Sequence, residues 1–152
     1  MSAIASHKIR IPGWLRSYFR LTKPKDLIGR WGERAARKYL RSTGAIAVTT
    51  NWRNKIGELD LIAIDKRTLL IVEVKTRHIS QLAMYPAIAA VTHDKRHRLE
   101  SLGRSFMRNH GPFCRRYAIS NRRTDVIEVY YSRSWLGTLK ACRICWHKGI
   151  TT

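Results

Sequence analysis

Two acidic residues and a lysine interrupt a pair of adjacent apolar segments in the middle of the chain. Asp60 lies in the first segment, and Glu73 and Lys75 lie in the second. Both segments are rich in β-branched residues and meet at a polar turn, a pattern typical of a β-hairpin. Burying an uncompensated carboxylate is costly, so two acids in central strands require a chemical explanation.

The turn predicts which residues of the hairpin face each other. If residues 66–67 form a two-residue loop, Asp60 lies directly opposite Glu73. The same register places Glu58 opposite Lys75. Side chains alternate along a strand, so these four residues are expected to share one face. The opposite face is predicted to be apolar throughout, and it comprises Leu59, Leu61, Ala63, Leu70, Val72 and Val74. Both faces are therefore expected to be covered, as in an α/β sandwich.

Two carboxylates about 5 Å apart repel each other unless a proton or a cation lies between them. Mg²⁺ relieves this repulsion, because it accepts a few carboxylate oxygens while keeping bound water. Such a site polarises a phosphodiester and makes bound water more nucleophilic. Lys75 would project beside the metal, where its ammonium can orient the water or stabilise negative charge. The alternative is a salt-bridge cluster in which the acids pair with Lys75 and nearby arginines, an arrangement that adds little net stability.

The whole chain is strongly basic. Its 152 residues include 30 Lys and Arg against 10 Asp and Glu, which gives a formal net charge of +20 and a pI near 11.0. This charge favours a polyanionic partner, and nucleic acid leads because the basic residues run through the whole chain. An anionic membrane surface is the second choice. No apolar stretch approaches the ~18 residues of a membrane-spanning helix, and no membrane partner is expected.

Residues 1–25 mix basic and aromatic side chains between Pro and Gly breakers, and are expected to form a flexible basic arm. They lack the apolar core of a secretory signal, and three cysteines are too few for a disulfide framework, so a cytoplasmic protein is expected. Cys142, Cys145 and His147, helped by Cys114, would be candidate zinc ligands. A second CxxC pair is missing, however, and ordinary partly buried cysteines are the simpler interpretation.

The elements that must position the acids follow from periodicity and breakers. A helix is predicted over 27–42, capped by Asp26 and ended by Gly44. One broad arc of this helix is apolar, and Glu33 lies at its edge. Beyond that edge lies a continuous basic face, formed by Arg30, Arg34, Arg37 and Arg41.

A strand is predicted at 46–51, before the hairpin. After the hairpin, 79–90 has a helical pattern weakened by Pro86, and a more regular helix spans 92–109, with Gly111-Pro112 as its stop. Two strand-like segments follow at 116–120 and 125–131. Residues 132–152 form a tail to which no element is assigned.

These residues resemble a known superfamily. Asp60 followed by Glu73-x-Lys75, in a hairpin after an N-terminal helix, resembles the PD-(D/E)XK nucleases. A finer resemblance, to the YraN-type family of bacterial proteins, covers roughly residues 27–131. It is carried by Gly29-x-x-Gly32-Glu33-x-Ala35-Ala36, Tyr39-Leu40, Gly44, Asn51-Trp52-Arg53, Gly57-Glu58-Leu59-Asp60-Leu61-Ile62-Ala63, Val72-Glu73-Val74-Lys75-Thr76-Arg77 and Arg123-x-Asp125-Val126.

The resemblance implies a restriction endonuclease-like α/β core, similar to that of Holliday-junction resolvases. A mixed central sheet would be flanked by helices, and its β-hairpin would carry the acidic site. The domain would span 26–131, between the arm (1–25) and the tail (132–152).

The resemblance also implies roles for individual residues. The metal ligands would be Asp60 and Glu73, with Glu33 as an acid contributed by the helix and Lys75 as the catalytic lysine. Mg²⁺ is the expected metal, with Mn²⁺ as an alternative. Glu33 has a second interpretation, as a surface glutamate paired with Arg37 one turn later.

Two functions stay open. The first is a Mg²⁺-dependent endonuclease that hydrolyses phosphodiester bonds of DNA, including branched or structured DNA. The second is a non-catalytic nucleic-acid-binding protein with a nuclease-like fold. The acids and Lys75 favour the first, because a pure binding module has no need of carboxylates on a phosphate-binding surface. DNA is favoured over RNA, and a homodimer stays open. The residues expected to contact nucleic acid are Arg30, Arg34, Arg37, Arg41, Arg53, Arg77 and Lys95.

Overall fold

The computed structural model describes residues 24–83 and 91–150. Its elements, in chain order, are α2 (Pro24–Ser42), β1 (Ile46–Asn54), β2 (Gly57–Asp65), β3 (Thr68–His78), η1 (Ile79–Gln81), α3 (His93–Asn109), α4 (Gly111–Arg116), β4 (Asn121–Arg133) and β5 (Leu139–His147). The expected basic arm lies outside the described residues, apart from its last two, which begin α2.

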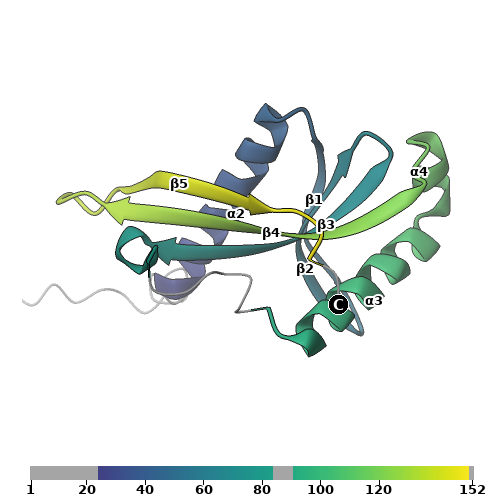
Figure 1. The fold of residues 1–152 in the computed structure, drawn as a ribbon, viewed down its shortest axis with the longest axis horizontal. Helices are drawn as coiled ribbons and strands as arrows, with labels where there is room; N and C mark the ends of the chain where they lie inside the picture. The colour runs from purple at the N-terminus through teal and green to yellow at the C-terminus, as the bar shows by residue number, and fades with distance from the viewer. Residues whose placement is uncertain (1–23, 84–90, 151–152) are drawn as a thin grey trace, which may run out of the picture.

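The five strands form one mixed sheet in the order β1-β2-β3-β4-β5. Neighbouring strands are antiparallel except β3 and β4, which run parallel. A parallel pair needs a long crossover, and this one passes through η1, α3 and α4. Helices α2 and α3 lie on opposite sides of the sheet (Figure 1). The predicted α/β class with a mixed sheet is confirmed, and the arrangement is consistent with a restriction endonuclease-like core.

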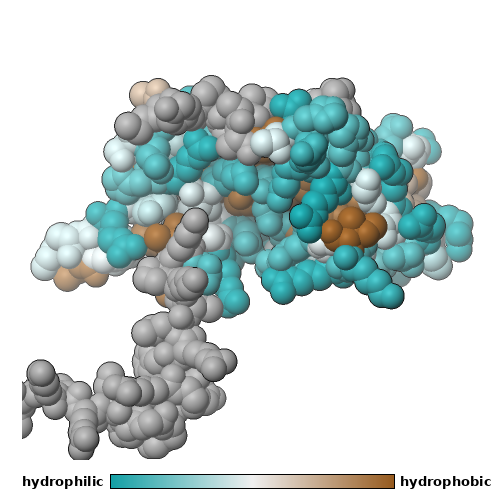
Figure 2. All heavy atoms as spheres, turned by 90° about the horizontal axis from the view of Figure 1, so that it is seen from below, coloured by the Kyte–Doolittle hydropathy of each residue, from teal (hydrophilic) through white to brown (hydrophobic). Residues whose placement is uncertain are grey.

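Each face of the sheet buries its own hydrophobic cluster. The cluster under α2 includes Ala36, Leu40, Leu61, Ala63, Leu70, Val72, Ile127 and Val129. The cluster under α3 includes Leu59, Ile62, Ile64, Leu69, Ile71, Leu99, Leu102, Phe106 and Val126. Both faces are therefore covered, and the outer surface visible in Figure 2 is mainly hydrophilic, with small separate hydrophobic areas.

Helix α2 begins two residues before the predicted cap, so Asp26 lies in its first turn, where a negative charge is favourable. The predicted stop is confirmed at Gly44, whose φ is +90°. The Gly44 N–H donates to Arg41 O at 3.1 Å, and the Ala45 N–H donates to Leu40 O at 3.1 Å. This pair of bonds is the Schellman arrangement, which a glycine at the left-handed position allows.

The structure corrects two predicted elements after the hairpin. The strand predicted at 116–120 is wrong, because α4 ends at Arg116 and a turn leads to β4 at Asn121. Pro112 lies in the first turn of α4, where its missing N–H is tolerated, so the Gly-Pro pair ends α3 and also begins a new helix. The helix predicted at 79–90 is a short 3-10 helix at Ile79–Gln81, and 84–90 lie outside the described residues.

The tail supplies an edge strand. β5 pairs with β4, and Ile150 packs into the cluster under α3. The buried Asp125 carboxylate holds this segment, because it accepts hydrogen bonds from Trp146 Nε1 at 2.9 Å and Gly149 N at 2.8 Å. Arg123 Nε donates to the same carboxylate at 2.8 Å. The sheet therefore continues past residue 131, the predicted end of the domain.

No helix within residues 24–83 and 91–150 has the length and apolar character needed to cross a membrane.

Candidate active site

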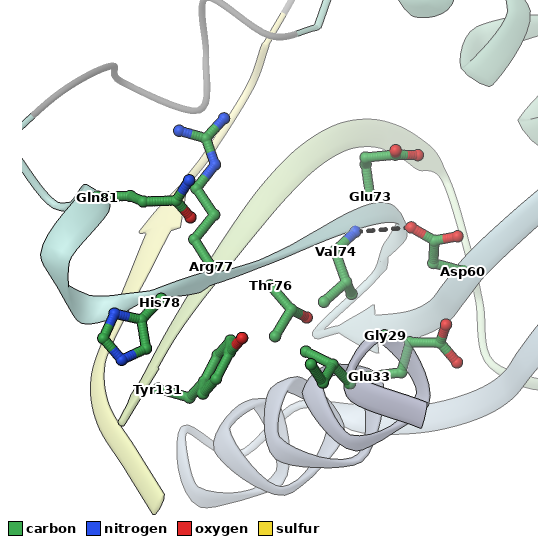
Figure 3. Close-up of a pocket in the computed structure, with 11 residues that line it drawn as sticks. Gly29, Glu33, Asp60, Glu73, Val74, Thr76, Arg77, His78, Gln81 and Tyr131 are labelled. Atoms are coloured by element: carbon green, nitrogen blue, oxygen red, sulfur yellow. Dashed lines mark hydrogen bonds between the residues drawn. The ribbon is translucent and has the colours of Figure 1, made fainter. Parts of the chain in front are cut away.

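The predicted hairpin register is confirmed next to the turn but does not reach the acids. Leu61 pairs with Val72 and Asp65 pairs with Thr68, as a two-residue loop requires. The paired register ends at Leu61 and Val72, so the structure does not show Asp60 paired with Glu73. Instead, Asp60 Oδ2 accepts a hydrogen bond from the backbone N–H of Val74 at 2.8 Å (Figure 3).

The N-terminal part of β2 pairs with β1 only. Glu58 lies opposite Arg53 and forms a salt bridge with it at 2.9 Å. The β2–β3 pairing ends at Leu61 and Val72, so the predicted pairing of Glu58 with Lys75 is wrong. Leu59 packs under α3 together with Ile62, whereas Leu61 packs under α2. The prediction that Leu59 shares the face of Leu61 is therefore also wrong.

The strand alternation breaks at the position of Asp60. The opposing strand is irregular at the same level, because Asn51 has a φ of +54°. Asn51 stands between Thr50 and Trp52, which pair with the residues on either side of Asp60. A regular strand would hold the Asp60 side chain on one face of the sheet. At this irregularity the carboxylate reaches the β3 backbone instead.

Asp60 is surrounded by charges that affect its ionisation. Burial, followed by the charge of Glu73, raises the pKa of Asp60 to about 6, and Glu33 adds to this effect. The Val74 hydrogen bond and the charge of Lys95 act in the opposite direction. The three predicted acids therefore act on one another electrostatically, with Asp60 in common.

Glu73 is only 4% exposed and lies between two lysines. Lys75 Nζ is 2.7 Å from Glu73 Oε1, and Lys95 Nζ is 3.2 Å from Glu73 Oε2. The second oxygen is buried and has no hydrogen bond of acceptable geometry within the described residues. Lys75 thus lies beside Glu73, one of the two acids. Lys95, expected to contact phosphate, pairs with Glu73.

Glu33 is carried by α2, which packs closely on β3 at Gly32. A Cβ added at Gly32 would overlap the side chain of Thr76, because it would lie 2.8 Å from the Cβ of Thr76. Glu33 Oε2 accepts a hydrogen bond from Asn51 Nδ2 at 3.0 Å. Its partner is therefore on β1 rather than on its own helix at Arg37, which is where the surface interpretation placed it.

Three cavities meet at Asp60. One, of about 490 Å³, lies between α2 and β3 and includes Glu33, Glu73 and Tyr131 (Figure 3). A second, of about 700 Å³, lies between α2 and the β1–β2 hairpin and includes Arg30 and Arg53. A third, of about 160 Å³, lies between β2 and α3 and includes Lys95 and Arg98. Asp60 is thus bordered by cavities on several sides, and each of them is also lined by at least one basic residue.

The acids do not form a three-ligand metal centre in this arrangement. Within residues 24–83 and 91–150, no three His, Cys, Asp or Glu side chains lie close enough together to hold one ion. The pair of Asp60 and Glu73 remains as the candidate for direct ligands, with Glu33 facing the same cavity.

The predicted basic face of α2 is only partly on the surface. Arg30, Arg34 and Arg41 are exposed, but Arg37 is half-buried and its Nε is buried without a hydrogen-bond partner in the described residues. Arg77 is half-buried and lines the cavity between α2 and β3.

Sequence reasoning missed several residues of the site. Arg98 lines the same cavity as Lys95, and their spacing of one helical turn was a usable signal. Asn51 was noted in a motif, but nothing in its sequence context indicated the bond to Glu33. His78, Gln81 and Tyr131 line the far end of the cavity along β3, and only the tertiary structure brings them there.

The cysteines do not assemble a zinc site. Cys114 is buried in α4, whereas Cys142 and Cys145 lie in the extended strand β5. His147 Nε2 is 2.8 Å from Glu128 Oε2. Within the described residues, these cysteines and His147 therefore do not belong to a group of three side chains that could hold one metal ion.

Comparison with known proteins adds the family. The model of the "Uncharacterised protein family UPF0102" matches residues 32–129, a range that includes Glu33, Asp60, Glu73 and Lys75. A UPF0102 protein of Beutenbergia cavernae is 41% identical over 112 residues, which cover 74% of this chain and 89% of that relative. Another UPF0102 protein, of Pseudarthrobacter chlorophenolicus, is 42% identical over 107 residues, which cover 70% of this chain and 76% of that relative. The chain therefore belongs to the UPF0102 family, the YraN-type family that its motifs indicated.

Proposed function

We propose that this protein is a Mg²⁺-dependent endonuclease that hydrolyses phosphodiester bonds of DNA, including branched or structured DNA. The observation that carries the proposal is that Asp60 and Glu73 line one cavity between α2 and β3, and the charge of Glu73 helps to raise the pKa of Asp60. Lys75 stands 2.7 Å from one of these acids. An acid pair with an adjacent lysine, on a chain of net charge +20, suits chemistry on a polyanion.

The residues fit a hard divalent cation. Asp60 and Glu73 would hold it through carboxylate oxygens, and Glu33 would face it through water. Glu73 Oε2 is buried without a hydrogen bond in the described residues, and a cation shared with Asp60 would satisfy that oxygen and relieve the repulsion. When bound, Mg²⁺ would polarise the phosphodiester and make its water more nucleophilic.

The remaining roles fall to residues of this chain. The Lys75 ammonium, freed from Glu73 when the acid turns to the ion, would orient the attacking water or stabilise developing negative charge. Arg30 and Arg98 line the cavities on two sides of Asp60, where they would hold the phosphates that flank the reacting one.

One observation favours the alternative, a nucleic-acid-binding protein that does not cut. Lys75 and Lys95 together already neutralise Glu73 without any metal. If this pairing persists in solution, the ammonium groups take the place of the cation, and the acids serve only to hold two lysines for phosphate contacts.

A cleavage assay separates these functions. Linear, flapped and four-way DNA and matching RNA would be incubated with the full chain in Mg²⁺, in Mn²⁺ and in EDTA, alongside calorimetric metal titration. Asp60→Asn and Glu73→Gln should keep the fold and lose metal affinity and cleavage. Lys75→Ala should not lose metal affinity but should slow cleavage by ~100-fold or more, because it removes a transition-state contact.

Asp94→Asn is the control, because this acid is fully exposed on α3. It should cleave like wild type. If wild type binds no divalent ion at millimolar concentration, or if Asp60→Asn cleaves normally, the endonuclease proposal fails and the binding function replaces it.

A further inference from the structure

The turn between β4 and β5 presents two large apolar side chains to solvent. Trp135 is 92% exposed and Leu136 is 71% exposed. The turn itself is well defined, because Ser134 N donates to Thr138 O and Gly137 N donates to Ser134 O, both at 2.9 Å. In Figure 1 the β4–β5 hairpin projects beyond the end of β3, and its tip is the leftmost part of the described residues. Figure 2 shows that end coloured white to brown.

The stem of this hairpin is basic. Arg133 and Lys140 are exposed and lie directly below the tip, on β4 and β5 respectively. An apolar tip on a cationic stem matches a partner that offers flat apolar faces next to negative charges. The bases and phosphates of a nucleic-acid strand have this chemistry.

The tip is connected to the candidate active site. The cavity at Asp60 runs between α2 and β3 as far as His78, Gln81 and Tyr131 (Figure 3). Tyr131 belongs to β4, which continues from there to the tip. Glu73 pairs with Val126, seven residues before Arg133, so the tip lies roughly 23 Å or more from the acids at about 3.3 Å per residue. That distance corresponds to about seven nucleotides at a rise of 3.4 Å.

We propose that the β4–β5 tip probes the substrate for a break in base stacking. Trp135 stacks on an unpaired base about seven nucleotides from the phosphate at the acids, and Leu136 enters the adjacent base step. Arg133 and Lys140 contact the phosphates beside it. The proposal rests on the proposed function and narrows its substrate class to DNA with a gap, flap or junction. In continuous duplex a base face becomes available to Trp135 only after unstacking, which costs a few kcal/mol per step, whereas an unpaired base offers its face without that cost.

Other occupants of the tip fit less well. A stable interface with a second copy buries about 800 Å² per partner, far more than two side chains provide. An anionic membrane surface would accept Trp135 and the basic stem but would not use the cavity that leads from the tip to the acids. The family match ends at residue 129, so the tip lies beyond the range that defines the family.

Binding in EDTA tests the tip without any cleavage. The full chain would be titrated with a continuous fluorescent duplex and with the same duplex carrying a three-nucleotide gap. Wild type should prefer gapped DNA. Trp135→Ala should bind gapped DNA about tenfold more weakly and continuous duplex less than twofold more weakly. Trp135→Phe should restore most of the loss, because it retains a stacking ring.

Ile46→Ala is the matched control, because Ile46 is 51% exposed on the opposite edge strand of the sheet, and it should leave both affinities unchanged. Equal weakening on both DNAs, or no weakening, would overturn the proposal. The proposal is also overturned if Trp135→Ala loses binding to phosphatidylserine vesicles but keeps its affinity for gapped DNA. A change in oligomeric state caused by Trp135→Ala would overturn it as well.

The two proposals fail separately. If the preference for gapped DNA depends on Trp135 in EDTA but no cleavage follows with Mg²⁺, the proposal for the β4–β5 tip is supported and the endonuclease proposal fails. If metal-dependent cleavage occurs and Trp135→Ala keeps the preference for gapped DNA, the endonuclease proposal is supported and the proposal for the tip fails.

Discussion

Asp60 holds its carboxylate where both burial and the charge of Glu73 oppose ionisation. The Val74 N–H compensates only part of this cost, since the pKa still rises from 3.8 to about 6. The folded protein therefore binds the Asp60 proton more tightly than the unfolded chain does. The stability contributed by this proton is complete below pH 3.8 and is lost as the pH rises through about 6.

We expect Asp60→Asn to remove this loss of stability. Asparagine can still accept the Val74 hydrogen bond but carries no charge. In EDTA, the variant should therefore be more stable than wild type at pH 7.5, by about 1–2 kcal/mol, and the difference should shrink toward pH 4.5. Urea unfolding of both proteins at several pH values measures this directly. A difference that stays constant with pH would show that Asp60 ionises as freely as in the unfolded chain.

Lys95 leads to a prediction about competition between an ammonium group and the metal for Glu73. Its ammonium lies 3.2 Å from Glu73 Oε2, the oxygen without a hydrogen bond in the described residues. Removing this charge by Lys95→Ala should tighten Mg²⁺ binding several-fold, because the ammonium competes with the cation for the same carboxylate. Calorimetric titration measures the effect, and Lys38→Ala, an exposed lysine on α2, is the control. Unchanged or weaker Mg²⁺ binding by Lys95→Ala would mean that the ammonium does not compete with the metal.

At the scale of elements, the contact between α2 and β3 determines where Glu33 lies. Gly32 allows the helix to approach Thr76 so closely that a Cβ would overlap its side chain. Gly29 lies one turn earlier on the same helix, and a Cβ added there would have nothing within 4 Å. The two glycines therefore have different structural roles although both belong to one sequence motif.

We expect Gly32→Ala to force α2 away from the sheet and to destabilise the protein by about 1–3 kcal/mol. Gly29→Ala should stabilise it by about 0.5–1 kcal/mol, because alanine is the better helix former and meets no obstacle. Chemical unfolding of the two variants gives the comparison. Combining Gly32→Ala with Thr76→Ala should recover part of the loss, and a failure to recover any would mean that the contact is not the cause.

The charge of the whole molecule leads to the last prediction. Arg30 and Arg34 are exposed on α2, and Arg30 lines the cavity between α2 and the β1–β2 hairpin. Reversing both to Glu should weaken DNA binding and lower the slope of log affinity against log salt by about two, at roughly 0.9 per phosphate contact. Reversing Arg115 and Arg116, exposed at the end of α4, is the control with equal charge. If both double variants lower the salt slope equally, net charge alone drives DNA binding and the position of the arginines does not matter.

Local signals in the sequence determined much of this protein. Turn residues and strand alternation predicted the hairpin, and helical periodicity with the stops at Gly44 and Gly111-Pro112 predicted the two main helices. The acids and Lys75 were found because charged residues are unusual within apolar strands. These features depend on neighbours within a few residues, so the sequence carries them directly.

Tertiary structure decided the rest. Asp60 bonds to the Val74 amide at the level where β2 pairs with β1 and no longer with β3. This outcome depends on contacts between separate segments of the chain. Lys95 reaches Glu73 because of the way α3 crosses the sheet. β5 was missed because an exposed edge strand needs no apolar alternation, and it is held in place by Asp125 from another strand. Each of these outcomes results from the packing of distant segments, which no local pattern encodes.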